Sequence, residues 1–354
     1  MAAAVTVEVW AAEDTTPSDI DAALRGLLEE QHAKGQALAP ARVINMVAVV
    51  DSSWRGEILN RLERVGRYHP SRTILCSVED GRTTIDARAT LTADGTADPG
   101  ISVVEERVDI RIGPAHLRRL DSIVDPLILP DLTTVVWAPH GHAEAIDAMR
   151  GLADVILLDS SDEPDMRTAI NRVCHLADHA YIVDLAWLRS TPWRERIAAT
   201  FDPPRWRDML RQISRVEVRH RPDSAVSAVL LLGWFSSRLG WQPDSLLSEG
   251  GRFHGRAKAG KGDVRLDLEP VPDLGAPGLG GITVETAAGV SLALDRGPGG
   301  LHARRRAADG KETSWVVLGA SRGEAGILGE GIRQALLRDP TYGPAVRCAL
   351  ALIS

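Results

Sequence analysis

Apolar residues recur at two different spacings along the first part of the chain. Residues 17–35 place leucine and isoleucine three and four positions apart, which predicts an amphipathic helix. The continuous apolar run at 43–51 is typical of a strand buried on both faces. A second helical pattern at 52–66 and a second strand at 72–80 follow. The order strand, helix, strand predicts a βαβ unit with parallel strands.

The same alternation continues as far as residue 178. Two segments within 82–112 alternate polar and apolar residues, and they indicate a hairpin or an extension of the sheet. Short apolar strands at 133–139 and 154–161 are separated by helical patterns. We therefore interpret residues 1–178 as an α/β domain with a mixed, largely parallel sheet and flanking helices.

The pattern changes in the second half of the chain. Helical patterns at 185–201 and 223–240 precede a glycine-rich region at 250–318, where short alternating segments recur. Such segments predict an antiparallel sheet, and two further helical patterns follow it. We predict that residues 179–354 form a C-terminal α+β domain.

Composition narrows the classes of function. The 354 residues are 44% hydrophobic and 25% charged, as in a folded globular protein. The formal net charge of −7 lacks the basic field that nucleic-acid binding uses. The apolar runs are too short to span a bilayer, and the first residues do not resemble a signal peptide. Three widely spaced cysteines, Cys76, Cys174 and Cys348, favour a reducing compartment. We expect a cytoplasmic protein that binds neither nucleic acid nor membrane.

Fragments of catalytic motifs occur, but none is complete. Residues 255–261 have the glycine and lysine spacing of a phosphate-binding loop, yet Gly262 replaces the hydroxyl residue and a strand follows, so we predict a hairpin turn. Ser321 lies in a G-x-S-x-G pattern with no histidine after it. His175 and His179 lack a clear third metal ligand. The dinucleotide fingerprint is also absent after the first buried strand. The sequence therefore contains no complete catalytic, cofactor-binding or metal-binding motif.

Tryptophan and arginine are concentrated in residues 184–196. Both residue types are enriched at the energetic centres of protein–protein interfaces, although a buried tryptophan often serves packing alone. Pro192 predicts a break between two helices. We interpret the segment as either a contact surface for a partner protein or the rigid support beneath one. Its candidate residues are Trp187, Arg189, Trp193, Arg194 and Arg196.

His69 and Arg72 form a second candidate pair. They lie in the sequence HPSR, where Pro70 fixes the entrance to the strand at 72–80. They could contact a partner at the edge of the sheet. Alternatively, they belong to a structural turn in which the arginine satisfies the carbonyl groups at the end of a helix.

Three segments occur in a characteristic order: RYHPSRTILC at 67–76, PLILPDLTTVVWAP at 126–139 and DLAWLRSTPWRERIAATFD at 184–202. Together they resemble the glucose-6-phosphate dehydrogenase assembly protein family, OpcA, of actinobacteria and cyanobacteria. The resemblance implies a non-catalytic partner that binds glucose-6-phosphate dehydrogenase and promotes its assembly or active state. It thereby implies support of NADPH production in the oxidative pentose phosphate pathway. No cofactor or catalytic residue comes with the family.

A second hypothesis is a sugar-phosphate-binding α/β enzyme. Arginines near strand ends could hold a phosphate, and the fold class does not exclude this. The basic triplet Arg304–Arg306 is either the solvated end of a strand or an anion-binding group. Direct binding of glucose 6-phosphate or 6-phosphogluconolactone would favour this hypothesis.

Overall fold

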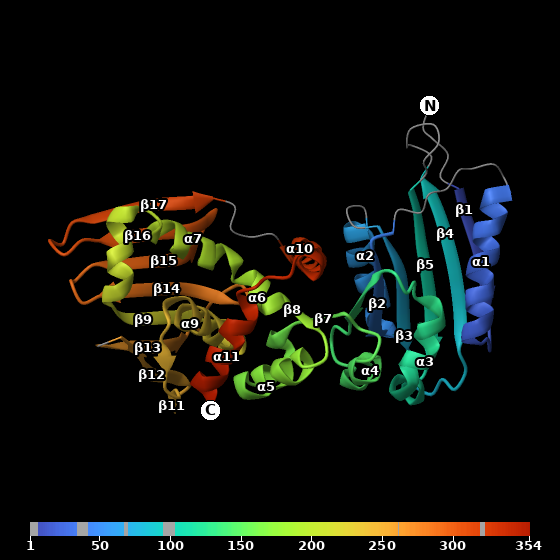
Figure 1. Ribbon diagram of the computed structural model, residues 1–354, viewed down its shortest axis with the longest axis horizontal. Helices are drawn as coiled ribbons and strands as arrows, with labels where there is room; N and C mark the ends of the chain where they lie inside the picture. The colour runs from blue at the N-terminus through green and yellow to red at the C-terminus, as the bar shows by residue number, and fades with distance from the viewer. Residues whose placement is uncertain (1–5, 34–41, 67–69, 95–102, 261, 319–322) are drawn as a thin grey trace. The chain divides into compact units, whose positions relative to one another are not determined.

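The chain forms two compact units, each assembled from several stretches of sequence. The computed structural model describes residues 6–33, 42–66, 70–94, 103–260, 262–318 and 323–354 (Figure 1). The first unit comprises residues 1–158, 179–183 and 328–338. The second comprises residues 159–178, 184–327 and 339–354. The sequence interpretation placed a single boundary between residues 178 and 179, whereas the chain passes between the units at several points.

The first unit contains an eight-stranded sheet with the order β1-β4-β5-β3-β2-β6-β7-β8. Its strands are β1 (Thr6–Ala12), β2 (Ile44–Asp51), β3 (Ser71–Val78), β4 (Asp86–Asp94), β5 (Val103–Ile112), β6 (Thr133–Trp137), β7 (Val155–Leu158) and β8 (Tyr181–Asp184). Its helices are α1 (Pro17–Ala33), α2 (Arg55–Gly66), α3 (Leu120–Val124), α4 (Ala143–Met149) and most of α10 (Gly323–Leu337).

The predicted α/β class is confirmed in this unit. The strands from β5 through β3, β2 and β6 to β7 pair in parallel, and α2 connects β2 to β3. Strands β2 and β3 are buried along nearly their whole length, as continuous apolar strands in a covered parallel sheet should be. The predicted hairpin is the antiparallel pair β4–β5. Strand β1, which the sequence interpretation missed, pairs with β4.

The second unit contains a nine-stranded sheet with the order β10-β12-β13-β9-β14-β15-β16-β17, and β11 pairs with β12. Its strands are β9 (Ile213–His220), β10 (Gln242–Pro243), β11 (Leu247–Glu249), β12 (Arg252–Ala259), β13 (Gly262–Pro270), β14 (Leu279–Thr286), β15 (Ser291–Gly297), β16 (Gly300–Arg306) and β17 (Glu312–Leu318). Its helices are α5 (Met166–Ala177), α6 (Leu185–Arg189), α7 (Thr191–Phe201), α8 (Pro204–Arg207), α9 (Ala225–Leu239) and α11 (Tyr342–Ile353).

The predicted antiparallel sheet is confirmed, with one exception at its centre. Strands β9 and β13 pair in parallel, and the other recorded neighbours pair antiparallel. The sequence interpretation missed β9, whose apolar positions alternate with charged ones over only eight residues. This alternation gives the sheet one apolar face, which helix α9 covers at β9 and β13, and one charged face. On the charged face Arg215 pairs with Asp267 at 2.8 Å and Arg219 with Asp295 at 2.9 Å.

Helices α9 and α11 pack against each other unusually closely at Gly233. A Cβ atom placed on Gly233 would lie 2.2 Å from the carbonyl oxygen of Ala345 and 3.0 Å from the amide nitrogen of Ala349. Only glycine fits this contact without displacement of a backbone. Within the described ranges, no helix has the length and apolar character that a bilayer span requires.

Candidate partner-binding site

The tryptophan–arginine segment folds into two short helices. Helix α6 ends at Arg189, α7 begins at Thr191, and Pro192 lies in the first turn of α7, so the predicted break is confirmed. Asp184 caps α6, because its carboxylate accepts a hydrogen bond of 3.0 Å from the backbone N–H of Ala186. The two tryptophans of the segment therefore belong to different helices.

Trp187 lies at the centre of a buried polar cluster, which we call the Trp187 cluster and which comprises Asp184, Trp187, Arg194, Asp339 and Tyr342. The indole is 2% exposed, and its Nε1–H donates to Oδ2 of Asp339 at 2.9 Å. The guanidinium carbon of Arg194 lies 3.4 Å from the ring centroid. The hydroxyl of Tyr342 donates to Oδ2 of Asp184 at 2.9 Å. The cluster links α6 and α7 to the beginning of α11.

The charges of this cluster respond to burial in different ways. Burial lowers the pKa of Arg194 to about 10, which still leaves the guanidinium protonated at neutral pH. Burial also opposes ionisation of Asp339, but hydrogen bonds from Thr341 and Trp187 outweigh it and lower the pKa of Asp339. Burial raises the pKa of Asp184, and the nearby charge of Asp159 adds to this. The cation of Arg194 is thus stabilised by the indole face and by the carboxylate of Asp339.

The remaining residues of the segment lie at different depths. Trp193 is 3% exposed in α7, and Arg194 is 7% exposed. Arg189 forms an ion pair of 2.5 Å with Asp159. Arg196 is exposed on the outer side of α7. Trp187, Trp193 and Arg194 are therefore part of the packing of α6 and α7, whereas Arg196 is accessible from outside.

The second predicted pair divides differently. His69 lies outside the described residues. Arg72 is buried in the first unit, where its Nε donates to Oε2 of Glu106 at 2.7 Å, and Arg42 pairs with the same carboxylate. Its Nη1 donates at 2.9 Å to the carbonyl oxygen of Leu127, the last residue of a short 3₁₀ helix. This is the geometry of the structural alternative, in which the arginine satisfies the end of a helix.

A groove in the second unit runs beside Arg196. It has a volume of about 260 Å³ and lies where α7 and α8 meet strands β15 to β17. Its lining residues are Arg196, Ala199, Thr200, Pro203, Trp206, Leu294, Arg305, Trp315 and Val317. The lining therefore combines two indoles and two guanidinium groups, and it contains no carboxylate.

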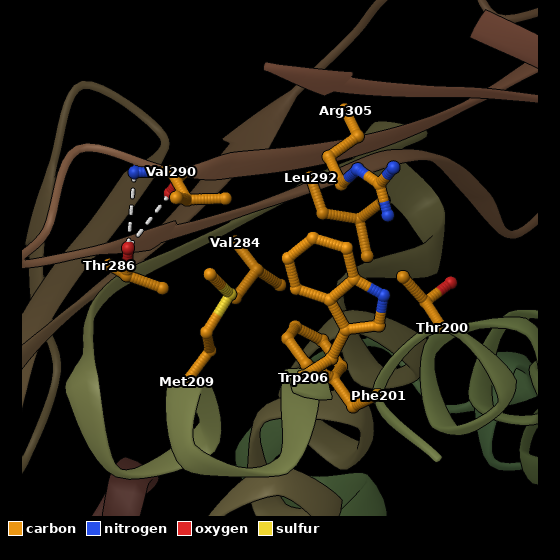
Figure 2. Close-up of a pocket in the computed structure, with 9 residues that line it drawn as sticks. All are labelled: Thr200, Phe201, Trp206, Met209, Val284, Thr286, Val290, Leu292 and Arg305. Carbon is orange, nitrogen blue, oxygen red and sulfur yellow. Dashed lines mark hydrogen bonds between the residues drawn. The ribbon is translucent and has the colours of Figure 1, made fainter. Parts of the chain in front are cut away.

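Trp206 forms the floor between this groove and a smaller cavity. The guanidinium of Arg305 lies 4.4 Å from the Trp206 ring centroid. Figure 2 shows the indole in the middle of the cavity residues, with Arg305 beside it and Met209 and Val284 toward the other side. The cavity volume is about 20 Å³, enough for one water molecule. The apolar packing beneath the groove is therefore nearly complete.

Sequence reasoning missed most of this groove. Arg305 belongs to the basic triplet that was interpreted as either a solvated strand end or an anion-binding group, and its side chain lies on the helix-covered face over Trp206. Trp315 lies two residues before Val317 in β17, so both side chains share one face of the strand. That spacing was the available signal, but it does not show which helix lies opposite.

The motif fragments have plain structural settings where they are described. Ala259 pairs with Gly262 and Gly260 has a φ of 62°, so β12 and β13 are the antiparallel strands of a hairpin, as predicted; Lys261 lies outside the described residues. Ser321 lies outside the described residues. Among the described residues, no group of three or more His, Cys, Asp or Glu side chains is arranged to hold a metal ion.

Two solved structures match the chain at low similarity. They are the WlbA (WbpB) dehydrogenase of Thermus thermophilus, with a TM-score of 0.45 and 12% identity, and the apo scyllo-inositol dehydrogenase of Lactobacillus casei, with a TM-score of 0.44 and 11% identity. The matches cover 88% and 89% of this chain and 95% and 96% of those chains. A shared activity does not follow from such a likeness.

Sequence relatives are closer. The OxPP cycle protein OpcA of Synechococcus elongatus is 29% identical over 242 residues, which cover 66% of this chain and 54% of that protein. The OpcA protein of Synechocystis is 30% identical over 144 residues, which cover 40% of this chain and 30% of that protein. The chain thus spans about half, or less, of the length of the curated relatives it matches.

Two family matches cover most of the chain. Residues 62–175 match the glucose-6-phosphate dehydrogenase subunit N-terminal domain, and residues 180–346 match the corresponding C-terminal domain. Both descriptions carry the name OpcA, as do the sequence relatives. The resemblance stated from the sequence is confirmed: the chain belongs to the OpcA family of glucose-6-phosphate dehydrogenase assembly proteins.

Proposed function

We propose that this protein is a non-catalytic assembly factor or allosteric activator that binds glucose-6-phosphate dehydrogenase and promotes its active state. The observation that carries the proposal is the match of both halves of the chain to domains named for that enzyme. In this role the protein supports NADPH production in the oxidative pentose phosphate pathway. The proposal includes a cytoplasmic location, which agrees with three free cysteines and no recorded disulfide among the described residues.

An activator of this kind acts through differential affinity. It must bind the competent state of the dehydrogenase more tightly than the other state, because equal affinity for both shifts nothing. Couplings of about 1–3 kcal/mol, or roughly 5- to 150-fold in affinity, are typical of such effects. A surface that grips one state needs rigid side chains, since ordering of flexible ones on binding costs free energy.

The tryptophan–arginine segment supplies such rigidity. Within the Trp187 cluster, a hydrogen bond of 2.9 Å and a cation–π contact of 3.4 Å hold α6 and α7 in place. Arg196 lies on the exposed side of the same helix α7. We assign direct contact to Arg196 and the groove beside it, and support to the buried residues of the segment.

A titration tests the proposal. Purified protein is added to glucose-6-phosphate dehydrogenase from the same organism, and NADPH formation is followed at low and high glucose 6-phosphate. Molar mass is measured by light scattering on the same mixtures. A saturable increase in rate together with a new complex is expected. A change in the oligomeric mass of the dehydrogenase would distinguish assembly from activation at constant mass.

The opposite result is equally clear. No complex and no rate change, with both proteins folded, would overturn the proposed function. The sugar-phosphate hypothesis is tested in the same experiment by isothermal titration of glucose 6-phosphate and 6-phosphogluconolactone into the protein alone. Saturable heat without the dehydrogenase would favour that hypothesis.

A further inference from the structure

Strand β17 forms an open edge of the nine-stranded sheet. It is the last strand in the sheet order, and its seven residues pair with β16 without a register shift. Within the described residues, no other segment forms a backbone hydrogen bond with β17. Its outer N–H and C=O groups are therefore a template for another strand.

This edge lacks the features by which proteins block unwanted pairing. Between Thr313 and Val317 it contains no proline, no charge and no bulge. Its two large central side chains are exposed, Trp315 to 36% and Val316 to 50%. At the opposite edge of the same sheet, β10 and β11 are only two and three residues long. The seven-residue strand β17 is thus unprotected between Thr313 and Val317, whereas the strands at the other edge are short.

The groove beside β17 has the opposite charge to the chain as a whole. The chain carries a net charge of −7, yet the groove lining holds Arg196 and Arg305 and no carboxylate. Neither arginine has an ion-pair partner among the described residues. Trp315 and Val317 of β17 point toward this same groove, because they line it. The site therefore offers apolar contact and two cations next to free backbone groups.

We propose that β17 and this groove bind an extended, acidic segment of glucose-6-phosphate dehydrogenase, which adds to the sheet as a further strand. The inference rests on the proposed function and names its contact surface. A strand added to an edge supplies affinity through main-chain hydrogen bonds, and pockets for alternate side chains supply specificity. The side chains that enter the groove are then two residues apart in the added strand, because alternate residues of a strand share one face.

The chemistry of that segment follows from the lining. One of its groove-facing side chains is apolar and packs against Trp315 and Val317. Another is Asp or Glu and pairs with the guanidinium of Arg196, in the bidentate geometry that arginine and carboxylate favour. Two tryptophans and two arginines at one site match the composition of interface hot spots.

The experiment compares four variants with the wild type in binding to the intact dehydrogenase. Trp315→Ala removes the apolar contact, and Arg196→Glu reverses the charge. Two matched controls alter exposed residues that do not line the groove. Val316→Ala changes the opposite face of the same strand, and Arg256→Glu reverses a charge on β12 near the other edge of the sheet. Unchanged thermal unfolding confirms that each variant is folded.

The expected results are specific to the groove. Trp315→Ala should raise the Kd by about 30-fold, as truncation of a hot-spot tryptophan does. Arg196→Glu should raise the Kd by about tenfold and reduce the salt dependence of binding. The two controls should bind within about twofold of the wild type. Hydrogen–deuterium exchange should show new protection of residues 312–318 in the complex, because the outer amides become hydrogen-bonded.

Each alternative outcome overturns the inference in a recognisable way. If the wild type binds the dehydrogenase but β17 gains no protection and the groove variants bind normally, the surface is wrong while the proposed function stands. If the wild type does not bind at all, both fall. If residues 312–318 become protected with rising protein concentration in the absence of the dehydrogenase, the occupant is a second copy of this chain.

Discussion

Replacement of Trp187 by phenylalanine tests whether the Trp187 cluster stabilises the second unit through its polar contacts. The substitution retains an aromatic ring but removes the N–H that donates to Asp339 at 2.9 Å. A hydrogen bond to a charged acceptor contributes about 1.5–3 kcal/mol. The contact of Arg194 with the ring also weakens, because phenylalanine is a poorer cation–π partner, and this costs roughly 0.5–1 kcal/mol. The polar loss is therefore about 2–4 kcal/mol.

Trp193→Phe is the matched control for this change. Trp193 is as deeply buried as Trp187, at 3% against 2% exposure, and it lies on the adjacent helix. Its indole N–H has no hydrogen bond within the described residues. Loss of ring volume affects both variants, so the difference between them isolates the polar contacts. Urea unfolding followed by circular dichroism should place Trp187→Phe about 2 kcal/mol or more below Trp193→Phe in stability.

The pH dependence provides a second, independent readout. The pKa of Asp339 is lowered below its ordinary value of 3.8, partly by the Trp187 hydrogen bond. A lowered carboxyl pKa contributes stability above the unfolded-state value, and this contribution is lost as the pH falls through the folded-state pKa. The stability gap between wild type and Trp187→Phe should therefore narrow as the pH falls from about 7 to about 3. Equal destabilisation by both tryptophan variants, with a pH-independent gap, would refute the role assigned to the cluster.

Three further predictions concern other parts of the fold. Gly233→Ala should lower the free energy of unfolding by about 1–3 kcal/mol, because the added methyl group displaces α11. The control Gly343→Ala should be neutral or slightly stabilising in the same denaturation assay, because there is space for a methyl group at this position of α11. Burial raises the pKa of Cys76 to about 12, so native-state alkylation mapped by mass spectrometry at about pH 8 should leave Cys76 unmodified after the other two cysteines have reacted. Burial lowers the pKa of His220 from 6.5. The contribution of His220 to folding stability should therefore be complete above about pH 6.5 and be lost as the pH falls below it. Between about pH 7 and pH 5, the His220→Gln variant should lose less stability than the wild type.

The sequence predicted the elements of this protein better than it predicted their partners. Periodicity is a local signal, and it placed most helices and the covered strands β2 and β3 correctly. It also predicted the helix break at Pro192, because proline restricts its own neighbourhood. Strand β9 was missed because its alternating stretch is only eight residues long and lies between two strong helical patterns.

The candidate site was predictable only in part, for a physical reason. Trp187 and its acceptor Asp339 are 152 residues apart, and Asp184 and Tyr342 are 158 apart. No local pattern shows that such residues meet, so the sequence left both a contact surface and a rigid support open. The same applies to Arg196 and Trp315, which line one groove from a helix and a distant strand. The residue types indicated a binding or supporting role, but the sequence did not show how deeply each side chain is buried.

The division of each unit among separate stretches of chain has a consequence for synthesis. The first unit is complete only when residues 328–338 join residues 1–158 and 179–183. At a synthesis rate of about 5–20 residues per second, roughly 10–40 seconds separate the emergence of residue 158 from that of residue 338. During that interval the nascent first unit exposes whatever those late residues later cover. A fragment ending at residue 178 would lack residues 328–338 and would keep the first unit permanently unfinished. The second unit includes residues 339–354, so neither unit is complete before residues 328–354 have been synthesised.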